Sequence, residues 1–74
     1  MLMMTPLQPY RGFTASYGFD EADGVFHGRV LGIRDIVTFE ADTLADLQQE
    51  FLASVEDYLA FCEAHGKEPG PFDG

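Results

Sequence analysis

The stretch Thr43-Leu-Ala-Asp-Leu-Gln-Gln-Glu-Phe-Leu-Ala-Ser-Val-Glu-Asp-Tyr-Leu-Ala-Phe-Cys-Glu-Ala-His-Gly66 decides the fold of this chain. Its apolar residues recur at steps of three and four, which places them along one side of a helix. Thr43 and Asp46 have the spacing of an N-terminal capping box, and Gly66 supplies the left-handed residue with which helices commonly end. The sequence therefore predicts one long amphipathic helix whose apolar stripe is formed by Leu44, Leu47, Phe51, Val55, Tyr58, Leu59 and Cys62.

The residues before this helix alternate between apolar and polar types, as expected for strands with one buried face. Residues 13–19 form the first expected strand, and residues 20–24 form a turn with Gly24 at a position of positive φ. Residues 25–31 and 36–41 form two further expected strands, joined by a second turn. Three consecutive strands joined by short turns make an antiparallel meander, on which the helix then packs.

The expected fold is thus α+β: a three-stranded antiparallel meander followed by one long helix on one sheet face. Residues 1–9 are expected to be an irregular lead-in, residues 10–66 the domain, and residues 67–74 a Pro/Gly-rich tail or truncated linker, with room for a short extra C-terminal strand. The core is expected to contain Phe13, Tyr17, Phe19, Phe26, Val30, Val37, Phe39, Leu47, Phe51, Val55, Tyr58, Leu59 and Cys62.

The composition limits the classes of partner. A chain of 74 residues is one small domain, and its size favours association with itself or with another protein. The formal net charge of −9, from 13 acidic and 4 basic residues, repels nucleic acid and attracts a basic protein. The single cysteine, Cys62, excludes an internal disulfide and suits a reducing, cytoplasmic compartment. No segment has the length or apolar character of a membrane span.

Few residues are candidates for chemistry. Asp20, Glu21 and Asp23 lie close together in sequence and could hold Mg²⁺, but acidic residues are also ordinary in a solvated turn. His27 is expected to pack against a cross-strand neighbour, and Cys62, facing the core, is expected to be an inert thiol. We therefore expect no catalytic residue, no metal and no cofactor.

Three stretches carry a family resemblance: Tyr10-Arg-Gly-Phe-Thr-Ala-Ser-Tyr17, Asp23-Gly-Val-Phe-His-Gly-Arg-Val-Leu-Gly-Ile-Arg-Asp-Ile-Val-Thr-Phe-Glu40, and Phe51 followed by Val55-Glu-Asp-Tyr-Leu-Ala-Phe-Cys-Glu63 and Gly66-Lys-Glu-Pro69. Together they resemble the N-terminal domain of HicB-type antitoxins. The resemblance implies a partial ribonuclease H-like fold without a working nuclease site. It also implies binding to HicA, a small basic mRNA interferase. Such antitoxins usually continue into a DNA-binding domain, so the sequence is expected to be either a domain cut at its linker or a stand-alone relative.

The leading hypothesis is an inhibitory protein-binding module that masks a HicA-type toxin. The alternative is a self-associating domain, a dimer or tetramer, and a third reading is a weak metal-dependent nuclease. Exposure and charge on the expected strands and turns suggest the partner-contacting residues His27, Arg29, Arg34, Asp35, Glu21, Asp23 and Glu40.

Overall fold

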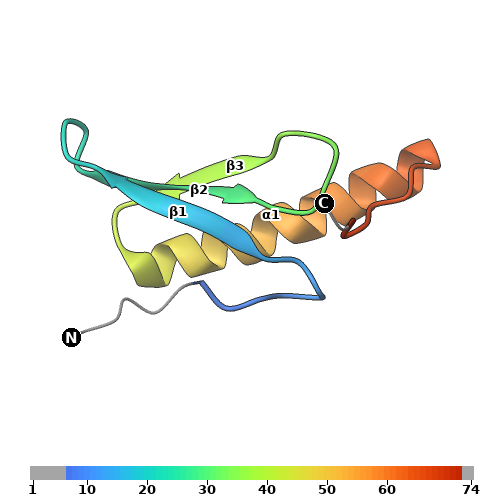
Figure 1. Ribbon diagram of the computed structural model, residues 1–74, viewed down its shortest axis with the longest axis horizontal. Coiled ribbons are helices and arrows are strands. Elements are labelled where there is room, and N and C mark those ends of the chain that lie inside the picture. The colour runs from blue at the N-terminus through green and yellow to red at the C-terminus, as the bar shows by residue number, and fades with distance from the viewer. Residues whose placement is uncertain (1–6, 73–74) are drawn as a thin grey trace.

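A long helix lies across one face of a three-stranded sheet in the computed structural model, which describes residues 7–72 (Figure 1). The elements are β1 (Ala15–Asp20), β2 (Val25–Val30), β3 (Thr38–Ala41) and α1 (Leu44–His65). The strands form an antiparallel meander in the order β1-β2-β3. The predicted α+β layout is therefore confirmed.

The ends of α1 follow from its capping residues. The Thr43 side chain accepts a hydrogen bond from the backbone N–H of Asp46 at 3.1 Å, which satisfies one of the amides left unpaired at a helix start. Gly66 has a φ of +68° and ends the helix, and its backbone N–H donates to the last turn. Both residues have the roles that the sequence predicts for them.

Two strands begin later than the sequence predicts. β1 begins at Ala15, because a tight turn at Arg11 and Gly12 joins Tyr10 to Phe13 in an isolated bridge. β3 begins at Thr38, after a loop that carries Asp35. Of the segments outside these elements, residues 67–72 form no strand, and residues 1–6 of the expected lead-in lie outside the described part.

The core lies between α1 and the strands β2 and β3. The Phe39 ring stacks on the Phe51 ring at 5.7 Å, and it also fills the space above Gly28, where a side chain would collide with it. Leu7 belongs to the expected irregular lead-in, yet it is buried in the core and only 7% exposed. In the described part of the chain the buried hydrophobic side chains are Leu7, Phe13, Val30, Phe39, Leu47, Phe51, Val55, Tyr58 and Cys62, and Tyr17, Phe26, Val37 and Leu59 are partly buried beside them.

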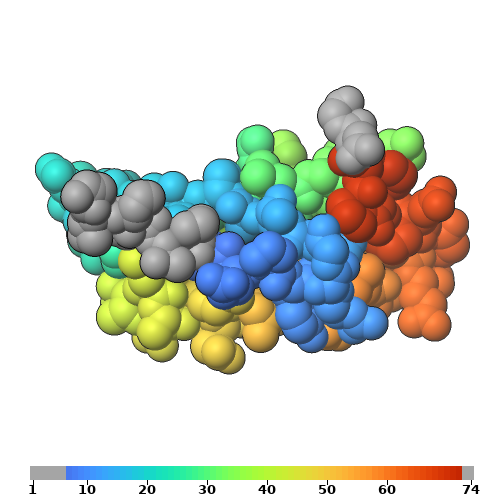
Figure 2. All heavy atoms as spheres, turned by 60° about the horizontal axis from the view of Figure 1, so that its bottom comes forward, coloured from blue at the N-terminus to red at the C-terminus, as the bar shows by residue number. Residues whose placement is uncertain are grey.

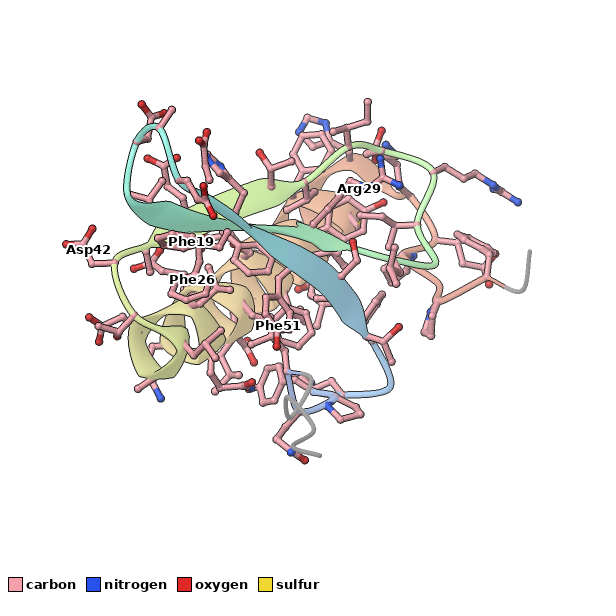
Figure 3. All side chains as sticks on the ribbon, turned by 60° about the vertical axis from the view of Figure 1, so that its left-hand side comes forward. Phe19, Phe26, Arg29, Asp42 and Phe51 are labelled. Atoms are coloured by element: carbon pink, nitrogen blue, oxygen red, sulfur yellow. The ribbon has the colours of Figure 1, made fainter. Side chains whose placement is uncertain are left out.

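Phe19 was expected in the core, but the structure shows that it is not buried. It shares the helix-facing side of the sheet with Phe26, and the two rings are 4.8 Å apart (Figure 3). Nevertheless 52% of Phe19 is exposed, because the main contacts of α1 are with β2 and β3 and leave the end of β1 uncovered. The alternation correctly predicts the face of this residue, but the position of the helix decides its burial.

Candidate functional site

Acidic side chains gather at one end of the molecule. The β1–β2 hairpin, the end of β3 and the start of α1 meet there (Figure 1). The four Lys and Arg side chains lie toward the opposite end, which we call the cationic end. They are Arg11 in the turn before β1, Arg29 in the last part of β2, Arg34 in the β2–β3 loop and Lys67 in the segment after α1. We call the first region the acidic end, and define it by Asp20, Glu21, Asp23, Glu40, Asp42, Asp46 and Glu50.

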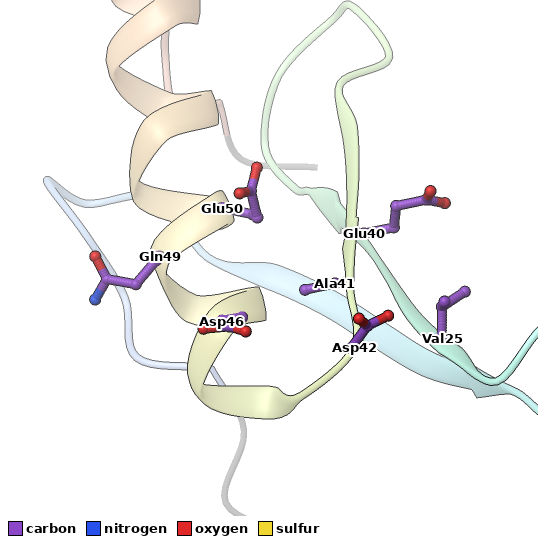
Figure 4. Close-up of a pocket in the computed structure, with 7 residues that line it drawn as sticks. All are labelled: Val25, Glu40, Ala41, Asp42, Asp46, Gln49 and Glu50. Carbon is purple, nitrogen blue, oxygen red and sulfur yellow. The ribbon is translucent and has the colours of Figure 1, made fainter.

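An open pocket of about 340 Å³ lies at the acidic end, between β3 and the first turns of α1 (Figure 4). Its wall includes four carboxylates, and among residues 7–72 those of Asp42, Asp46 and Glu50 form no ion pair. Unneutralised carboxylates grouped in a concave surface attract ammonium and guanidinium groups. The lining residues are Val25, Glu40, Ala41, Asp42, Asp46, Gln49 and Glu50.

His27 lies on the sheet face away from the helix, between two carboxylates. Its Nε2 atom is 3.7 Å from Asp20 Oδ2, and its Nδ1 atom is 3.4 Å from Glu40 Oε1. The other oxygen of Asp20, Oδ1, accepts from the backbone N–H groups of Ala22 and Asp23 and so shapes the turn. Among residues 7–72, no Lys or Arg side chain forms an ion pair with either of these two carboxylates.

Asp20, Asp23 and His27 have ligand atoms within 4.8 Å of one another, so the three side chains could share a cation. The sequence alone places Asp20 close to Asp23 but not to His27. The antiparallel hairpin brings them together, because His27 lies two residues after Val25, the cross-strand partner of Asp20. The hairpin register is the signal that could have revealed this grouping.

Two of the expected contact residues lie at the opposite end of the molecule. Asp35 Oδ2 accepts hydrogen bonds from Tyr58 Oη at 2.9 Å and from Lys67 Nζ at 2.6 Å. The Arg34 guanidinium lies 4.0 Å from the centre of the Phe72 ring. Arg34 and Asp35 therefore bind the β2–β3 loop to α1 and to the segment after it.

The other residues expected to contact a partner lie in two different regions of the molecule. Glu21, Asp23, His27 and Glu40 are exposed at the acidic end. Arg29 is exposed on the helix-free face, opposite Ser16 in the register and toward the cationic end. The set expected from the sequence thus does not form one surface, and three pocket residues, Asp42, Asp46 and Glu50, were absent from it.

Hydrogen bonds shift the pKa of several groups at the cationic end. The bond from Lys67, followed by that from Tyr58, lowers the pKa of Asp35. At a second cluster, Glu56 accepts from Tyr10 Oη and from Arg11 at 2.9 Å, and these bonds lower the pKa of Glu56. Burial, followed by hydrogen bonds with Cys62 and Asp35, raises the pKa of Tyr58.

Acid should destabilise the domain through Asp35 and Glu56. Their ordinary pKa values are 3.8 and 4.5, and both are lowered in the folded state. The unfolded chain therefore binds protons first as the pH falls, so this stabilisation is present near pH 7 and is lost below about pH 4.5. We expect the double variant Asp35→Asn/Glu56→Gln to show a smaller fall in melting temperature between about pH 6 and pH 3 than the unmodified domain.

The matched control is Asp57→Asn/Glu63→Gln, which removes the same two charges from exposed positions on α1. Thermal denaturation followed by circular dichroism measures all three proteins. Equal acid sensitivity of the two double variants would contradict the assignment to Asp35 and Glu56.

No family model, no curated protein and no solved structure matches this chain. A membrane-spanning helix is also not found, since α1 is not apolar enough in the described part of the chain.

Proposed function

We propose that this chain is an antitoxin-like domain that neutralises a small basic mRNA interferase of the HicA type. The acidic end carries this proposal: seven carboxylates lie there, and the four Lys and Arg residues of the chain lie elsewhere. A concave acidic surface suits a partner that itself binds RNA phosphates with lysine and arginine. The resemblance of residues 10–66 to HicB antitoxins supports the same class of partner.

The mechanism is masking without any reaction. Carboxylates of the pocket, such as Asp42 and Glu50, accept hydrogen bonds from cationic side chains of the toxin and occupy the surface that RNA would bind. The concentration of negative charge at one end also raises the rate of encounter with a basic protein at low salt. The unpaired Cys62 is compatible with action in the cytoplasm, where thiols remain reduced.

The test is to mix the domain with a purified mRNA interferase of the HicA type and to measure both binding and RNA cleavage. Neutralising the pocket with Glu40→Gln/Asp42→Asn/Glu50→Gln is expected to raise the dissociation constant about tenfold or more. The matched control, Asp57→Asn/Glu63→Gln/Glu68→Gln, removes the same charge from positions outside the acidic end. We expect the control to change the dissociation constant less than about threefold.

Two results would contradict this function. One is the absence of a complex at low salt, and the other is an equal loss of affinity in both triple variants, which would indicate a response to net charge alone. Restoration of RNA cleavage by the pocket variant, but not by the control, would support masking through the acidic end.

Self-association is a second candidate function. It is favoured by β1, which is an edge strand of the described sheet and carries the exposed Phe19. Light scattering over a range of concentrations tests it, because a mass that stays at 8.2 kDa would exclude a dimer.

A further inference from the structure

Three apolar side chains lie side by side across the sheet at the acidic end. Phe19 of β1 is the cross-strand partner of Phe26 on β2, and Phe26 is the partner of Ala41 on β3. Directly opposed residues of neighbouring strands share a face, and for these three it is the face that α1 packs on. We call Phe19, Phe26 and Ala41 the apolar row. It leads from β1 to the pocket, because Ala41 lines the pocket.

The apolar row is covered at one end and open at the other. Phe26 and Ala41 pack against the core, whereas 52% of Phe19 is exposed. Neighbouring strands are about 4.8 Å apart, so Phe19 is about 10 Å across the sheet from the pocket wall at Ala41. One partner protein can cover both, because a standard interface buries about 800 Å² on each side.

Carboxylates lie beside both ends of the apolar row. Asp20 follows Phe19 at the end of β1, and Asp42 follows Ala41 at the end of β3. Figure 3 shows Phe19, Phe26 and Asp42 at the same end of the sheet. An aromatic side chain inside a polar rim is the arrangement in which a few residues supply most of the binding energy of an interface.

The charge of the rim selects the occupant. A second copy that presented the same surface would bring two acidic ends together, and like charges across an interface suppress binding. An anionic lipid surface would be repelled for the same reason. A basic protein complements the rim, and its contact with the half-exposed Phe19 ring requires an apolar side chain among its cations.

We propose that the apolar row and the pocket form one docking surface, on which a basic protein places an apolar side chain against Phe19 and a lysine or arginine side chain in the pocket. This inference rests on the proposed masking function and adds the chemistry of the partner's contact surface. It requires that part of the affinity comes from apolar burial, which salt does not screen.

Calorimetric titration with a purified mRNA interferase of the HicA type tests the apolar contact. Phe19→Ala is expected to raise the dissociation constant about tenfold or more. Phe61→Ala is the matched control, because Phe61 is 46% exposed and lies near the far end of α1, beside His65 and Lys67. We expect the control to change the dissociation constant less than about threefold. Circular dichroism verifies that each variant is folded, and Phe19→Leu, which keeps an apolar side chain, should recover part of the loss.

The dependence on salt separates the two halves of the docking surface. The dissociation constants are compared at about 0.05 M and about 0.3 M salt, between which screening increases strongly. The fold-change caused by Phe19→Ala should be similar at both concentrations, because it reports apolar burial. The fold-change caused by the pocket variant Glu40→Gln/Asp42→Asn/Glu50→Gln should be smaller at the higher concentration.

The outcomes separate this inference from the function on which it rests. Absence of a complex at low salt would overturn both. A complex that is weakened by the pocket variant but equally little by Phe19→Ala and Phe61→Ala would leave masking standing and overturn the apolar contact. A change in the sedimentation mass of the domain alone on Phe19→Ala would show that a second copy covers Phe19, and would also overturn it. Selective, salt-insensitive loss of affinity in Phe19→Ala would support the inference.

Discussion

Phe51→Ala is expected to lower the free energy of unfolding by about 3–5 kcal/mol. Phe51 has no exposed surface, and its ring stacks on that of Phe39 between α1 and β3. Truncation loses the transfer free energy of the ring and leaves a cavity that the neighbours fill only in part. Because a domain of this size has a small total stability, we expect a large unfolded fraction at room temperature without denaturant.

Phe61→Ala is the matched control for this prediction, since it makes the same truncation on the same helix. Phe61 is 46% exposed and contacts His65 and Lys67 at the end of α1. Its loss should cost about 1 kcal/mol or less. Urea denaturation followed by circular dichroism compares the two variants, and similar midpoints would show that Phe51 is not the centre of the core.

Gly28→Ala should be the most damaging single-methyl change in the sheet. A Cβ atom at Gly28 would lie 2.4 Å from Cε2 of Phe39, well inside van der Waals contact. Either the Phe39 ring leaves its stack on Phe51 or β2 moves, and overpacking of this kind costs about 1–3 kcal/mol. We expect the urea midpoint to fall correspondingly.

Gly18→Ala is the control, because Gly18 is also a strand glycine and its Cβ would meet no atom within 4 Å. Replacing this glycine should be neutral or slightly stabilising. Phe39→Leu in the Gly28→Ala background removes the colliding end of the ring and should recover part of the loss. A Gly28→Ala protein as stable as Gly18→Ala would contradict the close packing of Phe39 on β2.

The helix was the most predictable part of the chain because its signals are local. Thr43 and Gly66 act on their own turns, and the apolar stripe needs only a period of 3.6 residues. Strand faces were also predictable from alternation, as Phe26 and Phe39 show. The direction in which the helix crosses the sheet depends on tertiary packing, and for that reason the exposure of Phe19 was predicted wrongly.

The candidate site was less predictable than the fold. Net charge follows from composition, but the separation of acidic and cationic ends depends on which loops meet in the folded chain. The sequence places Arg34 and Asp35 in a turn and predicts that they face solvent. Their partners Phe72 and Lys67 are more than thirty positions away in sequence. Such long-range pairs leave no periodic signal in a single sequence.

Cys62 carries the only thiol of the chain, and this thiol is buried. Its reactivity can therefore report how often the fold opens locally. Only 1% of this residue is exposed, and it lies in the last turns of α1, close to Tyr58. A thiol reagent can reach it only when those turns detach from the core, so the labelling rate reports the population of opened molecules. The same domain can thus be monitored at neutral pH without denaturant, tag or introduced fluorophore.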